Sequence, residues 1–221
     1  SPMSRGLGDV YKRQVHVLSE REWEYVDLET DGTVEALELG ITYDLRTLIM
    51  ASIDDSTILF QRTMDGSPEG RWVSNQIFQQ SSLIASSFSI SPSGQSWILS
   101  SGINQLVVAK SSHYTILERT LLDYGGFGSN LDIASVDYLK QHLVYQSRPA
   151  NSVWYSSSTD GTWSSPEQIG SLSLTLATPL QLHVDSENNP HVLMLDQLTG
   201  DLYLAKTVSY THLRAHETSE N

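Results

Sequence analysis

Short apolar segments recur along this chain at a fixed interval. Four of them begin at positions 58, 106, 154 and 202, so the interval is 48 residues each time. A second apolar segment comes about ten residues before each one, and a third, earlier still, alternates between apolar and polar side chains. Alternation with a period of two is typical of a strand with one buried face, as in residues 180–185. The pattern therefore predicts a repeated unit of β-strands.

An aromatic residue opens a fourth strand in successive units, at Trp23, Trp72, Tyr114 and Trp163. Turn residues such as Pro92, Gly94 and Gly200 stand between the predicted strands. Four antiparallel strands in about 40–50 residues are the signature of a β-propeller blade, so we predict an all-β propeller fragment. We assign the four blades to residues 34–79, 83–121, 131–170 and 176–207. Residues 15–18 and 23–28 would be the last two strands of a preceding blade, and the last blade would lack its fourth strand.

The two ends of the chain are related at the level of DNA. Residues 4–14 can be encoded by a segment whose reverse complement, translated in another frame, encodes residues 208–217. This inverted pair resembles the adaptor that is ligated onto DNA in tagmentation sequencing libraries. Engineered segments are excluded from reasoning about a fold. We therefore expect residues 1–14 and 208–221 to be disordered translated adaptor, and residues 15–207 to be an internal piece of a larger propeller.

Acidic residues outnumber basic ones, and the formal net charge is −13. Without the adaptor residues, Lys plus Arg falls from 13 to 9 and Asp plus Glu from 26 to 23, which gives −14. An anionic surface repels phosphate backbones and acidic lipid headgroups, so nucleic acid is not an expected partner. No apolar run approaches the ~18 residues of a membrane helix, so we expect no membrane insertion. Cysteine is absent, which excludes disulfides and thiolate metal sites.

Two predicted turns carry the residues of an Asp-box. The fuller copy consists of Ser158, Asp160, Gly161 and Trp163, and the looser copy of Asp65, Gly66 and Trp72. Both resemble the Asp-box of sialidase-like β-propellers, and residues 183–206 resemble repeats of bacterial secreted and cell-surface propellers. In that family the Asp and Ser side chains bond backbone groups of a hairpin and the aromatic residue packs between sheets. The resemblance implies a structural role, although the spacing from Asp to the aromatic is one residue shorter here.

One loop has the spacing of a cation site. Asp185, Glu187 and Asn189 occupy positions one, three and five, where hard-cation loops place oxygen ligands. The glycine and the bidentate glutamate of such a loop are missing, and an ordinary hairpin explains the same residues. His183 and His191 have no third ligand at a recognisable spacing. We therefore expect no metal and no other cofactor.

Loops on one face of a propeller usually bind its ligand. These are the loops between blades and the loops between the second and third strands of a blade. On that face we weigh seven residues as ligand contacts against a role as solvated loop residues. They are Asp54, Asp55, Tyr124, Phe127, Arg148, Asp196 and Gln197.

The chain lacks a convincing catalytic set. A sialidase-like enzyme needs an arginine cluster for the substrate carboxylate, and only Arg148 and Arg46 approach the expected ligand face. Glu35 and Asp132 begin the innermost strands of two predicted blades, at the mouth of the expected central channel. These two acids leave open the alternative that the chain is a fragment of a propeller glycoside hydrolase or lyase. Two carboxyls about 5–9.5 Å apart in an open pocket would favour hydrolysis. Our leading hypothesis is a non-catalytic propeller, secreted or at the cell surface, that binds carbohydrate or protein. A third hypothesis is that the propeller is a purely structural spacer.

Overall fold

The computed structural model describes residues 13–19, 22–62, 71–79, 83–112, 115–125, 127–137, 139–147, 152–171, 180–196, 198–209 and 212–217. Within these residues every regular element is a β-strand, and neighbouring strands in each sheet are antiparallel. This confirms the predicted all-β class and the repeated antiparallel sheets. The described part of the chain contains no helix that is long and apolar enough to cross a membrane.

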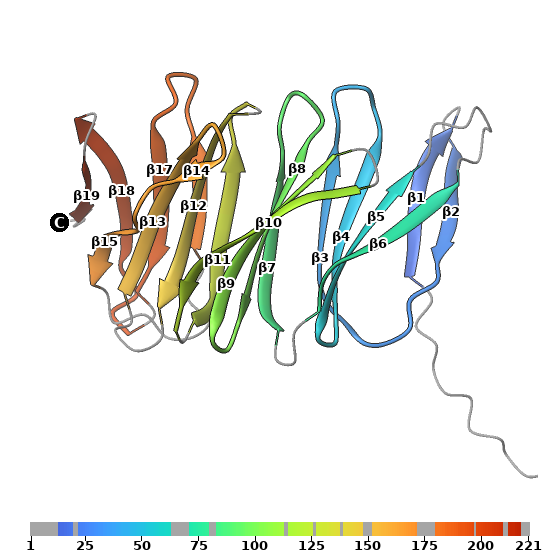
Figure 1. Cartoon of the computed structure of the whole chain (residues 1–221), viewed down its shortest axis with the longest axis horizontal. Helices are drawn as coiled ribbons and strands as arrows, with labels where there is room; N and C mark the ends of the chain where they lie inside the picture. The colour runs from blue at the N-terminus through green and yellow to red at the C-terminus, as the bar shows by residue number, and fades with distance from the viewer. Residues whose placement is uncertain are drawn as a thin grey trace, which may run out of the picture.

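Five sheets follow one another along the chain, and each is built from consecutive strands (Figure 1). A two-stranded sheet comes first, with β1 (Arg13–Ser19) and β2 (Glu22–Leu28). The first four-stranded sheet has β3 (Val34–Ile41), β4 (Thr47–Ile53), β5 (Ser56–Arg62) and β6 (Trp72–Gln79). The second has β7 (Leu83–Ile90), β8 (Ser96–Gly102), β9 (Gln105–Ser112) and β10 (Thr115–Tyr124).

Two more large sheets complete the series. We number the four large sheets from first to fourth along the chain and leave the β1–β2 sheet out of this numbering. The third sheet has β11 (Phe127–Ser135), β12 (Lys140–Ser147) and β13 (Ser152–Thr159), followed by an outer strand in two pieces, β14 (Thr162–Trp163) and β15 (Glu167–Ser171). Both pieces pair with β13. The fourth sheet has β16 (Leu180–Val184), β17 (Pro190–Leu195), β18 (Leu202–Ser209) and β19 (His212–Glu217).

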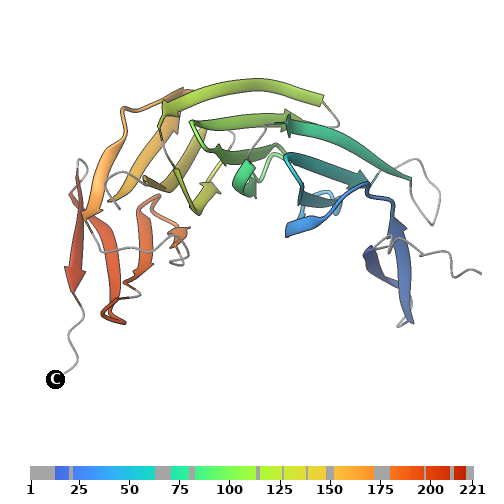
Figure 2. The same cartoon turned by 90° about the horizontal axis from the view of Figure 1, so that it is seen from below.

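The sheets stand side by side in an arc whose two ends lie apart (Figure 2). The first strand of each large sheet, namely β3, β7, β11 and β16, lines the concave side, and these strands contact one another in sequence. Apolar side chains fill the space between adjacent sheets. One cluster joins the first and second sheets, a second joins the second and third, and a third joins the third and fourth. Burial between the sheets, rather than within any one of them, therefore holds the arc together.

Three of the four hairpin turns that connect the first and second strands of a large sheet share one hydrogen-bond pattern. In each of the three, a side-chain oxygen of the first turn residue accepts the backbone N–H four residues later, as Asp185 accepts the N–H of Asn189 (2.8 Å). The other two pairs are Thr42 with Arg46 (2.9 Å) and Ser91 with Gln95 (3.3 Å). The fourth residue of each turn has a positive φ, which is 63° at Leu45 and 67° at Asn188. Hydroxyl and carboxylate side chains favour this kind of turn because they satisfy its inner N–H groups.

The fourth sheet differs from our expectation at its outer edge. We expected its fourth strand to be missing and residues 208–221 to be disordered, yet β19 pairs with β18 from Ser209↔His212 to Tyr203↔Glu217. Arg13 and Gln14, which we expected to belong to the disordered N-terminal segment, likewise begin β1. An unpaired strand edge presents a row of N–H and C=O groups that can pair with almost any extended segment. Pairing at an edge therefore does not require a sequence that evolved for it.

Candidate functional site

The residues predicted as ligand contacts fall into three groups. Arg148 and Gln197 lie outside the described residues, and for Tyr124 only the backbone, at the end of β10, is described. Asp54 and Asp55 form the tight turn between β4 and β5 and are exposed. The Asp54 carboxylate accepts the backbone N–H of Thr33 (3.1 Å), and Gly32 lets this loop approach, since a Cβ there would lie 2.2 Å from Asp54 Oδ2. Asp54 thus connects two loops of the expected ligand face.

The two remaining predicted contacts are buried. Phe127 is 2% exposed and packs edge-to-face on Tyr145, with ring centroids 5.7 Å apart. Asp196 is 4% exposed, and its Oδ1 accepts the backbone N–H of Leu198 (2.8 Å) in the turn between β17 and β18. The sequence placed both residues in surface loops because glycine or polar neighbours surround them. Their side chains instead contribute to the core and to a turn.

The Asp-box segment forms a short hairpin. Asp160 (φ 59°) and Gly161 (φ 78°) are the two central residues between β13 and β14, and two positive φ values are what a type I′ turn requires. Ser158 is buried and its hydroxyl has no hydrogen-bond partner in the structure. The inner bonds come from Ser164, whose hydroxyl accepts the Ser157 N–H (3.1 Å). The side-chain bonds that the family resemblance implies for Ser158 and Asp160 are therefore replaced by others.

Both aromatic residues of the predicted boxes lie between sheets. Trp163 is half-buried and meets Trp97 of the second sheet edge-to-face, with centroids 6.3 Å apart. Trp72 is half-buried against the cluster that joins β2 to the first sheet. Asp65 and Gly66 lie outside the described residues.

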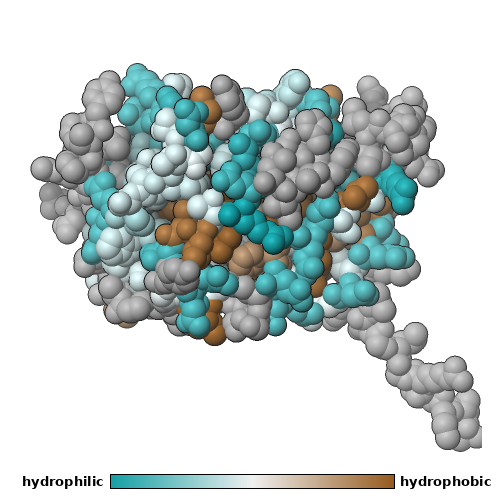
Figure 3. All heavy atoms as spheres, viewed as in Figure 1, coloured by the Kyte–Doolittle hydropathy of each residue, from teal (hydrophilic) through white to brown (hydrophobic). Residues whose placement is uncertain are grey.

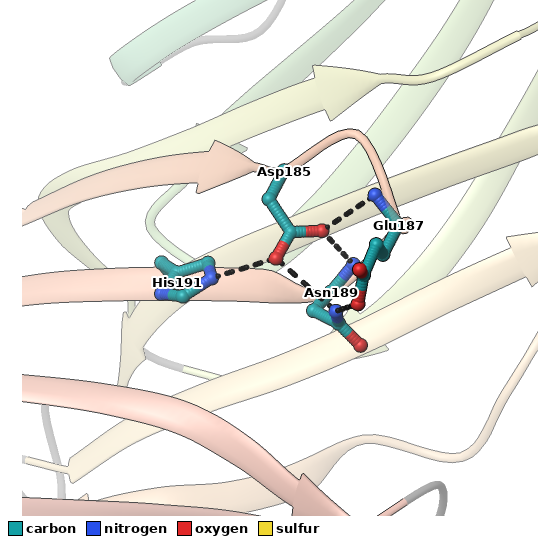
Figure 4. Close-up of polar contacts among 4 residues, drawn as sticks. All are labelled: Asp185, Glu187, Asn189 and His191. Carbon is teal, nitrogen blue, oxygen red and sulfur yellow. Dashed lines mark hydrogen bonds and ion pairs between the residues drawn. The ribbon is translucent and has the colours of Figure 1, made fainter.

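The loop with cation-site spacing is a closed hydrogen-bond network (Figure 4). Asp185 Oδ1 accepts the N–H groups of Glu187 (2.9 Å) and Asn189 (2.8 Å). Its Oδ2 accepts from Asn189 Nδ2 (3.1 Å) and His191 Nε2 (3.2 Å). These donors, chiefly Asn189, lower the pKa of the Asp185 carboxyl. The carboxylate thus faces donors, and the described residues contain no cluster of three or more His, Cys, Asp or Glu side chains that would hold a metal ion.

A linked pair of carboxyl groups lies on the concave side of the arc. Asp132, in β11, accepts the backbone N–H of Leu182 in β16 (2.7 Å) and the hydroxyl of Ser87 in β7 (3.1 Å). Glu38, in β3, accepts the backbone N–H of Phe88 in β7 (2.9 Å). Ser87 and Phe88, adjacent in β7, therefore each donate to one of the two carboxyls. Together these contacts bridge the innermost strands of all four large sheets.

Burial governs the protonation of both carboxyls. It raises the pKa of Glu38, against the lowering effect of the Phe88 N–H, and repulsion from Asp132 raises it further. Burial likewise raises the pKa of Asp132, which the donors from Leu182, Ser87 and Ile133 partly offset. Each carboxyl already accepts a backbone N–H from a neighbouring strand, so the main role of the pair is to join strands.

The acid that the sequence paired with Asp132 was Glu35, and this residue is exposed on β3. The sequence does not mark Glu38 as a candidate site residue, because it lies between Leu37 and Leu39 in an alternating strand, where polar residues are expected to face water. One regularity could have revealed it. Each acid precedes the residue whose N–H it accepts by 50 positions, from 38 to 88 and from 132 to 182, which is close to the repeat interval.

A buried histidine joins the third and fourth sheets. His142 Nδ1 lies 2.6 Å from the Tyr155 hydroxyl, and its Nε2 lies 3.0 Å from Asn188 Oδ1. Burial lowers the pKa of His142 and raises that of Tyr155 to about 12. A neutral ring suits both contacts, since Nε2–H donates to the amide oxygen while Nδ1 accepts the tyrosine proton. The arrangement is a structural bridge.

A cavity of about 520 Å³ opens between the second and third sheets, near their outer strands. β10 contributes Glu118, Thr120 and Leu121 to its wall, and the segment after the Asp160 turn contributes Trp163 and Ser164. This volume falls in the range of small-molecule sites. Glu118 is the one carboxylate among the described residues that line it, so the cavity does not contain the acid pair of a glycoside hydrolase.

No protein-family model and no curated protein matches this chain.

Proposed function

We propose that the chain is a segment of a β-propeller and that its four large sheets are blades. The proposal is carried by the open face of β3. Leu37, Leu39 and Ile41 are 50%, 67% and 61% exposed, although Glu38 between them is half-buried against the second sheet. Their neighbours on β4, Ile49 and Ala51, are buried beneath the β1–β2 sheet. An apolar stripe next to a two-stranded sheet is what an absent inner pair of strands leaves behind.

The opposite end of the arc supports the same proposal. Val192, Met194 and Ala205 of the fourth sheet pack on the third sheet. The other face of the same strands exposes Leu193 and Leu202 by 40% and 51%. A further blade on each side would bury both faces, which is how radial repetition stabilises this architecture.

We further propose a non-catalytic role, in which the propeller binds carbohydrate or protein as part of a larger secreted or cell-surface bacterial protein. The neighbouring carboxyls of Glu38 and Asp132 accept backbone N–H groups between strands, and Glu118 is the one acid among the described residues that line the cavity between the sheets. Neither arrangement supplies an acid and a base to a bound glycoside. The location and the ligand class rest on the resemblance to surface propellers.

The source gene tests the propeller proposal. We expect it to continue the repeat of about 48 residues beyond both ends of residues 15–207, with two strands immediately before β1. A gene without these repeats would overturn the proposal. Incubation of the chain with nitrophenyl glycosides tests the non-catalytic role, because turnover that Glu38→Gln and Asp132→Asn abolish would assign catalysis to these carboxyls.

A further inference from the structure

The third sheet breaks the regularity of the repeat at its outer strand. The first and second sheets end in single continuous strands, β6 and β10. In the third sheet, β14 stops at Trp163 and pairing with β13 resumes at Glu167 in β15, with a register shift between Val153 and Trp154. Pro166 stands at the interruption and has no N–H to donate to a ladder. Irregularities of this kind often lie next to functional sites.

The cavity lies at this interruption. Ser164, Ser165 and Pro166 form one side of it, because this segment leaves the ladder. Alternate residues of β10 form the opposite side, with Glu118 and Thr120 on the strand face that looks toward the third sheet. Leu121 extends the wall and is 40% exposed. Apolar atoms gather on the outer face of the molecule around β10 (Figure 3).

An aromatic ring is held in a fixed position in the wall. Trp163 packs against Trp97 at an interplanar angle of 78°, and Trp97 is itself buried under the Lys110 ammonium group, which lies 5.1 Å from its ring. Trp163 therefore offers a rigid, half-buried apolar surface in a cavity whose other side carries a hydroxyl and a carboxylate. Aromatic rings of this kind bind ligands that are apolar on one side and polar on the other.

The negative charge of the cavity wall and of the whole chain favours a neutral ligand over an anionic one. Glu118 is the one charged side chain among the described lining residues, and the whole chain carries −13. An anionic ligand would be repelled by both, whereas a carboxylate is a strong acceptor for neutral hydroxyl groups. A sugar ring combines an apolar C–H face with hydroxyls at its rim. A volume of about 520 Å³ has room for one or two such rings.

We propose that this cavity binds a neutral saccharide, with the apolar face of one ring on Trp163 and its hydroxyls on Glu118 and Thr120. The proposal rests on the binding role argued above and gives it a location and a ligand class. It places the ligand between two sheets on their outer side, away from the loops of Asp54 and Asp55.

The test is a titration of the whole chain, followed by tryptophan fluorescence and calorimetry. The probes are methyl β-glucoside, methyl β-galactoside, N-acetylglucosamine, lactose and cellobiose, with sialyllactose as the anionic comparison. We expect at least one neutral probe to bind more tightly than sialyllactose, and Glu118→Gln and Thr120→Val each to weaken it about tenfold. Both substitutions are conservative, and unchanged thermal unfolding will show that the variants are folded. The matched control is Glu187→Gln, an exposed carboxylate in the β16–β17 turn, which should leave the affinity unchanged.

The outcomes separate this proposal from the broader one. Binding of a neutral saccharide that both cavity variants leave unchanged would overturn the cavity assignment and keep the binding role. Preference for sialyllactose would overturn the ligand class. Absence of binding by every probe would overturn the saccharide proposal, while binding of a protein ligand would still be compatible with the proposed function.

Discussion

The contacts between neighbouring sheets are of two kinds. Between the first and second sheets, and again between the third and fourth, a carboxylate on one inner strand accepts an N–H from the next inner strand, at 2.9 Å for Glu38 and 2.7 Å for Asp132. Between the second and third sheets the acceptor of the backbone N–H is a neutral hydroxyl, since Ser89 Oγ accepts the Ser135 N–H (2.9 Å), while Asp132 accepts a side-chain hydroxyl, that of Ser87 (3.1 Å). The inner strands are thus joined at all three interfaces, and a carboxylate accepts a backbone N–H at two of them.

The interface between the second and third sheets relies more on aromatic packing. Trp97, Phe127, Tyr145 and Trp163 all lie between the second and third sheets, whereas aliphatic residues dominate the interface of the third and fourth sheets. Large rigid rings fill space less evenly than aliphatic chains do, and the cavity opens at the edge of this same cluster. The comparison therefore places the cavity at the interface that relies most on aromatic packing.

The largest expected effect is at the aromatic interface. Phe127→Ala removes a ring that is 2% exposed and packs on Tyr145, so we expect a loss of about 3–5 kcal/mol in the free energy of unfolding. Urea denaturation followed by tryptophan fluorescence measures it. Leu121→Ala, at an exposed position of the same interface, should cost less than about 1 kcal/mol. Equal losses in the two variants would show that Phe127 is not a core residue.

A smaller loss is expected at the carboxylate interfaces. Asp132→Ala leaves the Leu182 N–H and the Ser87 hydroxyl without their acceptor, which should cost about 2 kcal/mol, since an orphaned buried donor costs about 1–3 kcal/mol. Asp132→Asn keeps an acceptor oxygen and should cost less. Glu38→Ala should resemble Asp132→Ala if the two interfaces are equivalent. A loss in only one of the two alanine variants would break the comparison between them.

The sequence predicts the strands of these interfaces better than their contacts. Period-two alternation and the turn residues locate the strands, because both depend on neighbours within one hairpin. Whether Leu39 or Glu38 is buried depends on the sheet that packs alongside, and here β3 buries the acid and exposes the leucines. Phe127 shows the same limit. Its glycine-rich surroundings predicted a surface loop, while the structure starts β11 at this residue and buries it between sheets.

The candidate cavity was beyond prediction for a related reason. Trp163 and the Asp160–Gly161 turn are recognisable in the sequence, but Glu118 and Thr120 lie more than 40 residues away, in a strand whose facing partner no local pattern specifies. Pro166 was the available signal, since proline in an outer strand predicts an interruption of the ladder.

Removal of the Tyr145 hydroxyl tests a hydrogen bond at the edge of the aromatic cluster between the second and third sheets. The Tyr145 hydroxyl donates to Asp123 Oδ2 (3.0 Å), and burial raises the pKa of Tyr145, so the group remains a donor throughout the neutral range. Tyr145→Phe should cost about 1 kcal/mol, because Asp123 is half-exposed and can be rehydrated. Thermal unfolding measures the loss. Equal unfolding temperatures of Tyr145→Phe and the parent chain would show that this hydrogen bond does not contribute to stability.

The smallest effect, and the most direct contrast between the two kinds of interface, is in the pH dependence of stability. Burial raises the pKa of Glu38 and Asp132 above their ordinary values of 4.5 and 3.8, so the folded chain binds these protons more tightly than the unfolded chain. Their contribution to stability is therefore fully present below the ordinary values and is lost as pH rises through the raised ones. Asp185, whose pKa is lowered, acts in the opposite sense, since its contribution is present above 3.8 and is lost as pH falls.

Urea denaturation at a series of pH values from 3 to 7 separates these opposing contributions. Glu38→Gln with Asp132→Asn should remove the part of the unfolding free energy that declines as pH rises, so the double variant should be less sensitive to a shift from pH 5 to 7 than the parent. Asp185→Asn should instead flatten the rise from pH 3 to 4. The acceptor of the Ser135 N–H is the neutral Ser89 hydroxyl, so Ser89→Ala should lower stability by the same amount at every pH. A pH-dependent loss in Ser89→Ala would show that this hydrogen bond is coupled to the carboxyls, since Ser89 shares β7 with Ser87, whose hydroxyl Asp132 accepts.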